Sequence, residues 1–334
     1  MISSIPKIAL FGNRNSVQVA AVRDAVLAEG GEPILCDIQL GGSGQTTVSM
    51  GEGQAMWNGI NFADIEAIFI RCTAPNTLPT LPPMLNAVSH TQWRLQFMKE
   101  QFYQSSIFSF FNYLAQQGKL VINPLTGGYI DHDSKAQFYE KLRAKGFQVP
   151  RTLTTNEPDR ARLFLEQHSD VVVKPAIGVG STRVVTKSDR ERLKELSISP
   201  VLMQEQIQGQ TLRVHIVGNR VVLALRILGN DGVDSRTGEQ IFEYVKLPDE
   251  EEKKIVQANR YLGLHFAAWD IIESPSGEYF YLDCNPGPYV MWIGPDFVKA
   301  VFKQLAKYLI TFAKTKSLEE SASVIEPCCP NRWG

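Results

Sequence analysis

Two apolar stretches in the last third of the chain each carry an aspartate in their interior. The first, residues 267–272, contains Asp270, and the second, residues 279–285, contains Asp283 and Asn285. The Pro-Ser-Gly sequence between them is typical of a turn, so we expect a hairpin with one aspartate on each strand. Residues two apart on a strand point to the same face, which places Asn285 beside Asp283. A fold that buries this hairpin must supply a counter-charge, because unpaired buried carboxylates are costly.

A metal ion is the counter-charge that these side chains favour. Three oxygen donors with open coordination positions suit Mg²⁺, which keeps waters and binds substrate phosphates, and Mn²⁺ is the alternative. The competing interpretation is a structural ion-pair cluster, which would require nearby arginines. We rank the metal site first and expect Asp270, Asp283 and Asn285 to form it.

Composition limits the classes of partner and compartment. The chain has 334 residues, 44% of them hydrophobic, and a formal net charge of -1, so nothing favours nucleic acid or an anionic membrane as its partner. The five cysteines are scattered and lack CxxC pairs, which indicates reduced thiols and a cytoplasmic protein. The N-terminus has no basic segment followed by a long apolar run, so we predict no signal peptide. A homo-oligomer is compatible with this sequence.

The order of apolar segments predicts a mixed α/β and α+β protein with several lobes. The first 71 residues alternate as strand, helix, strand and strand, which favours a small α/β lobe with a parallel sheet. The aromatic-rich stretch 93–113 is expected to be a helix packed in the core, and a peptide-binding groove is the alternative. Further expectations are a mobile surface loop at 41–53, a strand at 149–152, a closing helix at 298–315 and a poorly ordered tail after 316.

A second candidate site follows the apolar strand 171–174. Lys174 ends this strand, where an ammonium group needs an anionic partner. The loop after it offers backbone amides and hydroxyls that could line a phosphate, and its members are Gly178, Gly180, Ser181 and Thr182. A strand-ending lysine followed by an ordinary turn is the equal alternative.

A third candidate is the stretch from residue 201 to 218. Backbone groups of Glu205, Gln206 and Ile207, next to Gln204, could pair with an adenine edge, while an ordinary hairpin is the stronger alternative. An alternating strand then carries Arg213 on one face. Arg226 and Arg236 follow nearby, and such planar cations suit phosphoryl or carboxylate groups.

Taken together and in this order, these features resemble the ATP-grasp superfamily, and most closely its RimK-like ligases. The resemblance covers residues 123–294. It rests on Lys135 in Asp-Ser-Lys-Ala-Gln, Val173-Lys174-Pro175, Gln204-Glu205, Arg213, Asp270 and Asp283-Cys-Asn285-Pro286. It implies an ATP-grasp fold in which two lobes clasp ATP behind an N-terminal α/β lobe. The implied domains are 1–123, a central subdomain 124–200, a metal-bearing subdomain 201–316 and a flexible tail 317–334.

The resemblance also implies roles for the cations. Lys135 and Lys174 would contact the phosphates of ATP, Arg213 and Arg226 would steady the γ-phosphate and an acyl phosphate, and Arg236 would hold a substrate. The implied activity is an ATP-dependent ligase that joins a carboxylate to an amine or hydroxyl, with a peptide as one candidate substrate. The alternatives are a small-molecule kinase and a nucleotide-binding protein with lost turnover. The latter is motivated by Asp283, where this family usually has Glu, and by Thr211 at a commonly acidic position.

Overall fold

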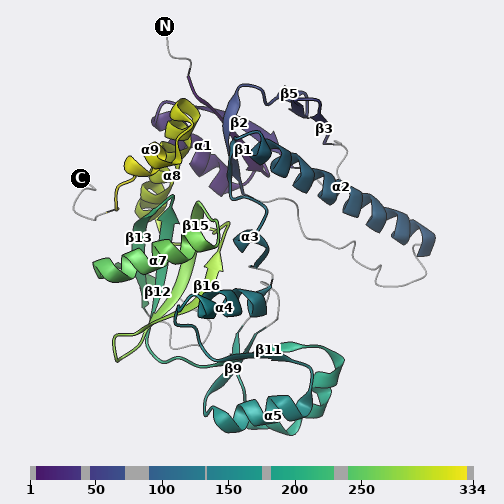
Figure 1. The fold of residues 1–334 in the computed structure, drawn as a ribbon, viewed down its shortest axis with the longest axis vertical. Coiled ribbons are helices and arrows are strands. Elements are labelled where there is room, and N and C mark those ends of the chain that lie inside the picture. The colour runs from purple at the N-terminus through teal and green to yellow at the C-terminus, as the bar shows by residue number, and fades with distance from the viewer. Residues whose placement is uncertain are drawn as a thin grey trace. The chain divides into compact units, whose positions relative to one another are not determined.

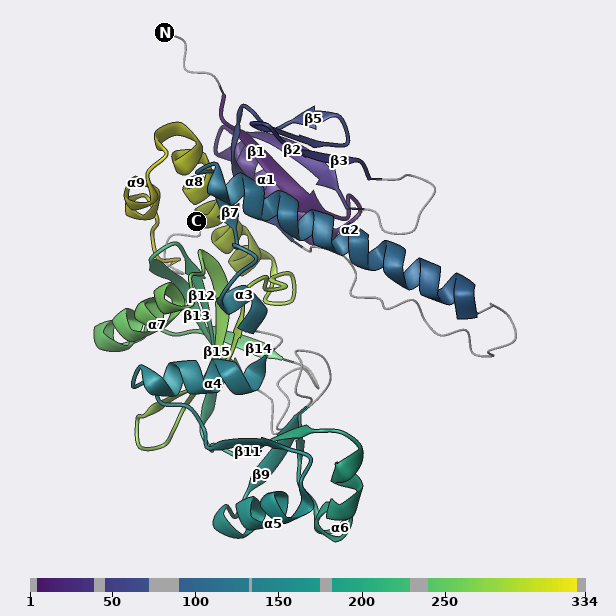
Figure 2. The same ribbon diagram turned by 45° about the vertical axis from the view of Figure 1, so that its right-hand side comes forward.

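The structure is a computed structural model that describes residues 5–38, 46–71, 90–131, 134–174, 182–228 and 240–328. The chain forms two compact units. Unit 1 comprises Met1–Leu125 and Tyr289–Ile325, and unit 2 comprises Thr126–Pro288 and Glu326–Gly334. Each unit is described separately below, and Figures 1 and 2 show their elements from two directions.

Unit 1 is built on a parallel sheet, as the alternating sequence predicted. Its strand order is β2-β1-β6-β7. Every strand of this sheet is short and largely apolar, which suits a sheet buried on both faces. The strands are β1 (Lys7–Gly12), β2 (Glu32–Asp37), β6 (Ile65–Ile70) and β7 (Leu120–Ile122).

Helices pack against this sheet. The helices α1 (Val17–Ala28) and α8 (Pro295–Thr315) lie side by side and both contact β1 (Figure 1). The long helix α2 (His90–Gln116) contacts β7, and its Phe110 and Phe111 pack on the Phe11 ring of β1. The sheet core is therefore aliphatic around α1 and aromatic around α2.

Two expectations for unit 1 were only partly correct. The core prediction for the aromatic stretch 93–113 holds for Phe110 and Phe111, which are fully buried, but Phe102 is 67% exposed. Residues 48–51 were predicted to be a loop, and they form β3 instead. This strand (Val48–Gly51) pairs in an antiparallel sheet with β4 (Gln54–Trp57) and β5 (Ile60–Asn61).

Unit 2 contains a smaller antiparallel sheet of order β10-β9-β11-β8. Its strands are β8 (Thr152–Thr155), β9 (Val171–Lys174), β10 (Arg183–Val184) and β11 (Val201–Glu205). The helix α5 (Pro158–Gln167) and the 3₁₀ helix η1 (Leu193–Ile198) cover one face, and the short helix α6 (Lys187–Glu191) precedes η1. The strand predicted at 149–152 begins three residues later, at Thr152.

The larger sheet of unit 2 has the order β14-β13-β12-β15-β16. Its strands are β12 (Gln210–Val217), β13 (Arg220–Leu228), β14 (Ile241–Tyr244), β15 (Phe266–Glu273) and β16 (Tyr279–Asn285). Helices α4 (Lys135–Ala144) and α7 (Asp249–Tyr261) supply apolar side chains to a core on one face, around Trp269 and Tyr281. The short helix α3 (Gly128–Asp131) precedes α4. The opposite face of this sheet is therefore the one left for polar chemistry.

The C-terminal part of the chain differs from the sequence-based expectation. The closing helix α8 belongs to unit 1 and not to the metal-bearing subdomain, because its apolar face packs on α1 and on the parallel sheet. Part of the predicted flexible tail is helical, since α9 (Leu318–Ser323) packs against α8. Within the part of the chain that the structure describes, no helix has the length and apolar character needed to cross a membrane.

Candidate functional site

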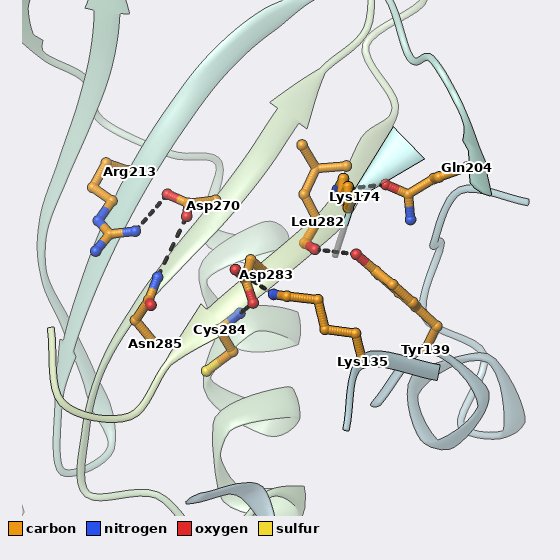
Figure 3. Close-up of polar contacts among 10 residues, drawn as sticks. All are labelled: Lys135, Tyr139, Lys174, Gln204, Arg213, Asp270, Leu282, Asp283, Cys284 and Asn285. Atoms are coloured by element: carbon orange, nitrogen blue, oxygen red, sulfur yellow. Dashed lines mark hydrogen bonds and ion pairs between the residues drawn. The ribbon is translucent and has the colours of Figure 1, made fainter. Parts of the chain in front are cut away.

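The predicted hairpin is present and places its polar side chains as expected. Asp270 on β15 lies directly opposite Asp283 on β16, and Asn285 lies opposite Ala268. The register shifts just after Asp270, yet the two aspartates and Asn285 keep the same face, the one opposite the apolar core. Figure 3 shows this cluster together with the cations around it.

Each aspartate is paired with a cation from another element. Lys135, the first residue of α4, places its Nζ 2.7 Å from Oδ2 of Asp283. Arg213 on β12 places one guanidinium nitrogen 2.6 Å from Oδ1 of Asp270, and its side chain is only 7% exposed. Two like charges on directly opposed strand positions repel each other, so these two ion pairs stabilise the hairpin. The ion-pair cluster considered above is therefore part of the site (Figure 3).

Backbone and amide groups fix the aspartates further. The backbone amide of Cys284 donates to Oδ1 of Asp283 at 2.9 Å, and Nδ2 of Asn285 lies 3.5 Å from Oδ2 of Asp270. Burial raises the pKa of the Cys284 thiol well above its usual value, and Asp283 adds to that shift. Cys284 is therefore a protonated packing residue and not a nucleophile.

Tyr139 is a site residue that the sequence analysis missed. Its hydroxyl donates to the carbonyl oxygen of Leu282 at 2.6 Å, which anchors α4 to β16 beside the Lys135–Asp283 pair. Burial raises the pKa of this hydroxyl, so it remains a donor. The signal was available, because Tyr139 follows Lys135 by four residues and such positions share one face of a helix.

The donor chemistry of the cluster fits a magnesium ion. Two carboxylates and one amide oxygen on a single sheet face are the hard oxygen ligands that Mg²⁺ takes. Across the described ranges no group of three or more His, Cys, Asp or Glu side chains is placed to hold a metal. The third protein donor beside the two carboxylates would be the Asn285 amide oxygen. Both carboxylates would also have to share their oxygens with Lys135 and Arg213.

The second predicted cation, Lys174, is held by a short chain of hydrogen bonds. Its Nζ donates to Oε1 of Gln204 at 2.7 Å, and Nε2 of Gln204 donates to Oγ1 of Thr152 at 3.0 Å. Gln204 is only 1% exposed, so its role here is to orient the lysine. The sequence analysis did not single out Thr152, because spacing does not reveal that β8 pairs with β11.

The predicted adenine-binding stretch is partly committed to other contacts. The Glu205 side chain accepts from the Arg151 amide at 2.7 Å, and the backbone amides of Glu205 and Gln206 donate to Arg151 and Asp170. The Glu205 carboxylate is therefore turned toward Arg151, the residue that precedes β8. Ile207 remains in the connection between β11 and β12, where a backbone contact to a base stays a prediction.

Arg226 does not join the cluster. Leu225 is the residue opposite Arg213, and strand neighbours alternate in direction, so Arg226 points to the other face of the sheet. There its guanidinium contacts Glu243 at 3.2 Å and Glu273 at 3.5 Å. The expectation that Arg226 and Arg213 steady the same phosphate is wrong, because sequence spacing alone did not fix the face of β13.

Several predicted residues cannot be placed in this geometry. Gly178, Gly180, Ser181 and Arg236 lie outside the described residues. Thr182 is described and directly precedes β10, the edge strand of the smaller sheet.

Comparison with known proteins identifies a domain within the chain. The family model described as an ATP-grasp domain matches residues 132–259, a region that contains Lys135, Lys174, Gln204 and Arg213. The chain contains an ATP-grasp domain. The fold of the whole chain agrees, since an ATP-grasp ligase called PsnB, solved with a minimal precursor, Mg and ADP, superposes with a TM-score of 0.79. That pair is 26% identical and covers 92% of this chain and 97% of PsnB.

Other proteins are similar to this chain over most or part of its length. The macrocyclase MdnC from Microcystis aeruginosa, bound to its precursor peptide MdnA, shares the fold at a TM-score of 0.71 and 20% identity, over 91% of this chain and 99% of MdnC. The tetrahydromethanopterin:alpha-L-glutamate ligase of Methanocaldococcus jannaschii is 27% identical over 58% of this chain and 72% of its own length. For an uncharacterized protein of the same organism, 26% identical over 48% of this chain, the match spans only 40% of the relative.

Proposed function

We propose that this protein is an ATP-dependent ligase that activates a carboxylate as an acyl phosphate and joins it to an amine or a hydroxyl. The observation that supports this most directly is the cluster on one face of the β15–β16 hairpin. There Arg213 and Lys135, two buried or nearly buried cations, meet Asp270 and Asp283, and Asn285 completes the set of oxygen donors. Phosphoryl transfer needs this combination, because catalysis consists mainly of positioning and charge neutralisation.

Each side chain of the cluster has its own role in the proposed reaction. Asp270, Asp283 and Asn285 would hold Mg²⁺ or Mn²⁺, which when bound supplies positive charge to phosphate oxygens. Lys174, oriented by Gln204, and Lys135 would bind the nucleotide phosphates. Arg213 would neutralise the charge that develops on the transferred group.

The ion pairs make binding of metal and nucleotide interdependent. Phosphate oxygens compete with Asp283 for Lys135 and with Asp270 for Arg213, while a metal ion competes with both cations for the carboxylates. A metal ion alone would pair with Asp270 and Asp283 and leave Lys135 and Arg213 without counter-charges. The nucleotide alone would pair with the two cations and leave the two aspartates without counter-charges. Metal and nucleotide together restore a charge-balanced site, so we expect ATP to bind much more weakly when the metal is chelated.

The substrate that we propose is a peptide with carboxylate side chains. This proposal is supported by PsnB and MdnC, which were solved with precursor peptides and share the fold over nearly the whole chain. The alpha-L-glutamate ligases match a smaller part of the chain, which makes addition of glutamate the competing outcome.

The deciding experiment incubates purified protein with Mg-ATP and the peptide fraction of its source cells. We expect ADP formation, a hydroxamate when hydroxylamine is added, and a peptide product whose mass is lower by one water. A product heavier by a glutamyl residue would support glutamate addition instead. A stable phosphorylated product without condensation would contradict the ligase and identify a kinase. Absence of ADP, with ATP still raising the melting temperature, would indicate a binding protein without turnover.

A further inference from the structure

The strand β16 carries one more residue than β15 at the centre of the candidate metal site. Tyr281 lies opposite Ile271, and Asp283 lies opposite Asp270. Among the described residues of β16, Leu282 therefore has no partner on β15. Such a β-bulge reverses the alternation of side chains, because one strand gains a residue while its neighbour does not.

The bulge decides which face of the sheet Asp283 occupies. Tyr281 belongs to the apolar core on one face, whereas Asp283 lies on the opposite face with Asp270. Residues two apart on a regular strand share a face. Without the extra residue, Asp283 would therefore lie opposite Trp269, a fully buried member of the core. The metal site proposed above thus requires the shifted register.

The extra residue is held by Tyr139 of α4. The hydroxyl of this fully buried tyrosine donates to the carbonyl oxygen of Leu282 at 2.6 Å (Figure 3). The helix is itself fixed in the core, since the Phe138 ring lies 6.0 Å from the Trp269 ring and Leu142 is fully buried. A bulge disrupts the ladder of backbone hydrogen bonds, and an unpaired buried carbonyl is costly. The Tyr139 hydroxyl therefore stabilises the bulged strand.

Two side chains of α4, one turn apart, contact neighbouring residues of β16. Lys135 pairs with the carboxylate of Asp283, and Tyr139 holds the carbonyl group of Leu282. In the proposed reaction Lys135 binds nucleotide phosphates and Asp283 binds the metal, so their ion pair is broken. The Leu282 carbonyl has no role in binding either ligand. The Tyr139 bond is therefore the contact that continues to hold the bulge when the ligands bind.

We propose that Tyr139 is a positioning residue, because its bond to Leu282 holds the register of β16. In that register the three proposed metal ligands share one face of the sheet. This inference rests on the function proposed above and adds to it a residue that acts on Asp283 through the backbone and not as a ligand. Loss of a residue that orients a metal ligand typically weakens metal binding by about tenfold or more.

The test compares two buried tyrosines that bear on the same hairpin. Tyr139→Phe removes the hydroxyl that holds Leu282 and keeps the ring. Tyr281→Phe is the matched control, because its hydroxyl donates to Oε1 of Glu251 at 2.8 Å and not to the bulge. Isothermal titration calorimetry on the full-length protein measures the Kd for ADP with Mg²⁺ and with EDTA.

The metal dependence separates positioning of the metal ligands from other effects. Tyr139→Phe should weaken Mg-ADP binding about tenfold and leave the Kd for ADP in EDTA unchanged, whereas Tyr281→Phe should change neither value. Burial raises the pKa of the Tyr139 hydroxyl and the nearby Gln204 lowers it, so an effect through Gln204 on Lys174 is the competing account. Equal weakening with and without the metal would identify that account and overturn the proposal. Wild-type Mg-ADP affinity in Tyr139→Phe, or an equal loss in Tyr281→Phe, would also overturn it.

A second measurement needs no ligand. The backbone amide of Cys284 donates to Oδ1 of Asp283 at 2.9 Å, so its hydrogen exchange reports on the bulge. We expect about tenfold faster exchange of this amide in Tyr139→Phe and no change in Tyr281→Phe, and wild-type protection in Tyr139→Phe would contradict the proposal. If wild-type protein bound ADP equally well with and without Mg²⁺, the proposed metal site would be refuted, and the exchange of Cys284 alone would decide the role of Tyr139.

Deletion of Leu282 separates the register from the hydrogen bond. A strand that lacks this residue places Asp283 opposite Asp270 without a bulge. In that background Tyr139→Phe should cause no further loss of Mg-ADP affinity. An equal loss in both backgrounds would show that Tyr139 does not act through the register. If the deletion variant does not fold, the two phenylalanine variants decide.

Discussion

At the scale of single residues, the proposed metal site is tested by removing the charge of Asp270. Asp270→Asn removes a charge from the site and from the Arg213 pair but keeps the shape of the side chain. We expect turnover of ATP to fall by about 100-fold, the effect of removing one charge-stabilising group from an active site. Steady-state ADP formation measures this, and near wild-type turnover in Asp270→Asn would show that Asp270 holds no metal.

Asp283 allows a graded comparison at the same site. Asp283→Glu lengthens the arm by one methylene and keeps both the charge and the reach to Lys135. We expect it to retain turnover within about tenfold of wild type, while Asp283→Asn should lose about as much as Asp270→Asn. Titration of activity against Mg²⁺ concentration distinguishes the variants, and equal Mg²⁺ dependence in all of them would contradict a metal role.

Lys174 is the residue whose loss should act on nucleotide binding. Lys174→Met keeps the length of the side chain but removes the ammonium that Gln204 orients. A charge-assisted hydrogen bond contributes about 2 kcal/mol, so the Kd for Mg-ATP should rise about 30-fold. Isothermal titration calorimetry measures the change, with Lys141→Met on α4 as the control, and an unchanged Kd would remove Lys174 from the phosphate site.

At the scale of elements, the hairpin and the parallel sheet were predictable from the sequence. The face of the sheet to which the side chains of β13 point was not. Asp270 and Asp283 could be assigned to adjoining strands because a short turn joins them, but it is the register shift just after Asp270 that brings Asp283, and not Leu282, opposite Asp270. The β13 strand pairs with β12 through a bulge near His215, and no sequence signal sets which face Arg226 takes. Helix α8 has a clear apolar face, but the sequence does not reveal that this face packs on a sheet nearly 300 residues earlier.

Gly209, at the junction of β11 and β12, should be sensitive to substitution. It has φ of +151°, and an added Cβ would lie 2.2 Å from the carbonyl oxygen of Glu273 on β15. We expect Gly209→Ala to lower the free energy of unfolding by at least about 2 kcal/mol, because β12 would have to move away from β15. Gly277→Ala is the matched control: its φ is +80°, no atom lies within 4 Å of the added Cβ, and the cost should be about 1 kcal/mol. Urea denaturation compares the two, and equal losses would contradict the predicted contact.

At the scale of the whole molecule, the two units should respond differently to acid. Unit 2 holds two histidines that are neutral in the folded state, whereas the sequence of unit 1 contains one histidine, His90, at the start of α2. Burial, with a smaller contribution from Arg213, lowers the pKa of His215 well below its usual value, and burial lowers the pKa of His265 to about 4. Both ring nitrogens of the fully buried His215 have no hydrogen-bond partner among the described residues.

The direction of the pH effect follows from proton uptake on unfolding. Below pH 6.5 the unfolded chain protonates these histidines and the folded chain does not, so stability is complete above that pH and is lost as the pH falls toward 4. Between pH 7.5 and 5.5 each such histidine should cost about 1.4 kcal/mol. Hydrogen exchange measured by mass spectrometry should therefore show a loss of protection in β12 and β15 that exceeds the loss in β1 and β6. His265→Gln should remove about half of this difference, and parallel losses in both units, or a difference unchanged by that substitution, would show that other groups control the acid response.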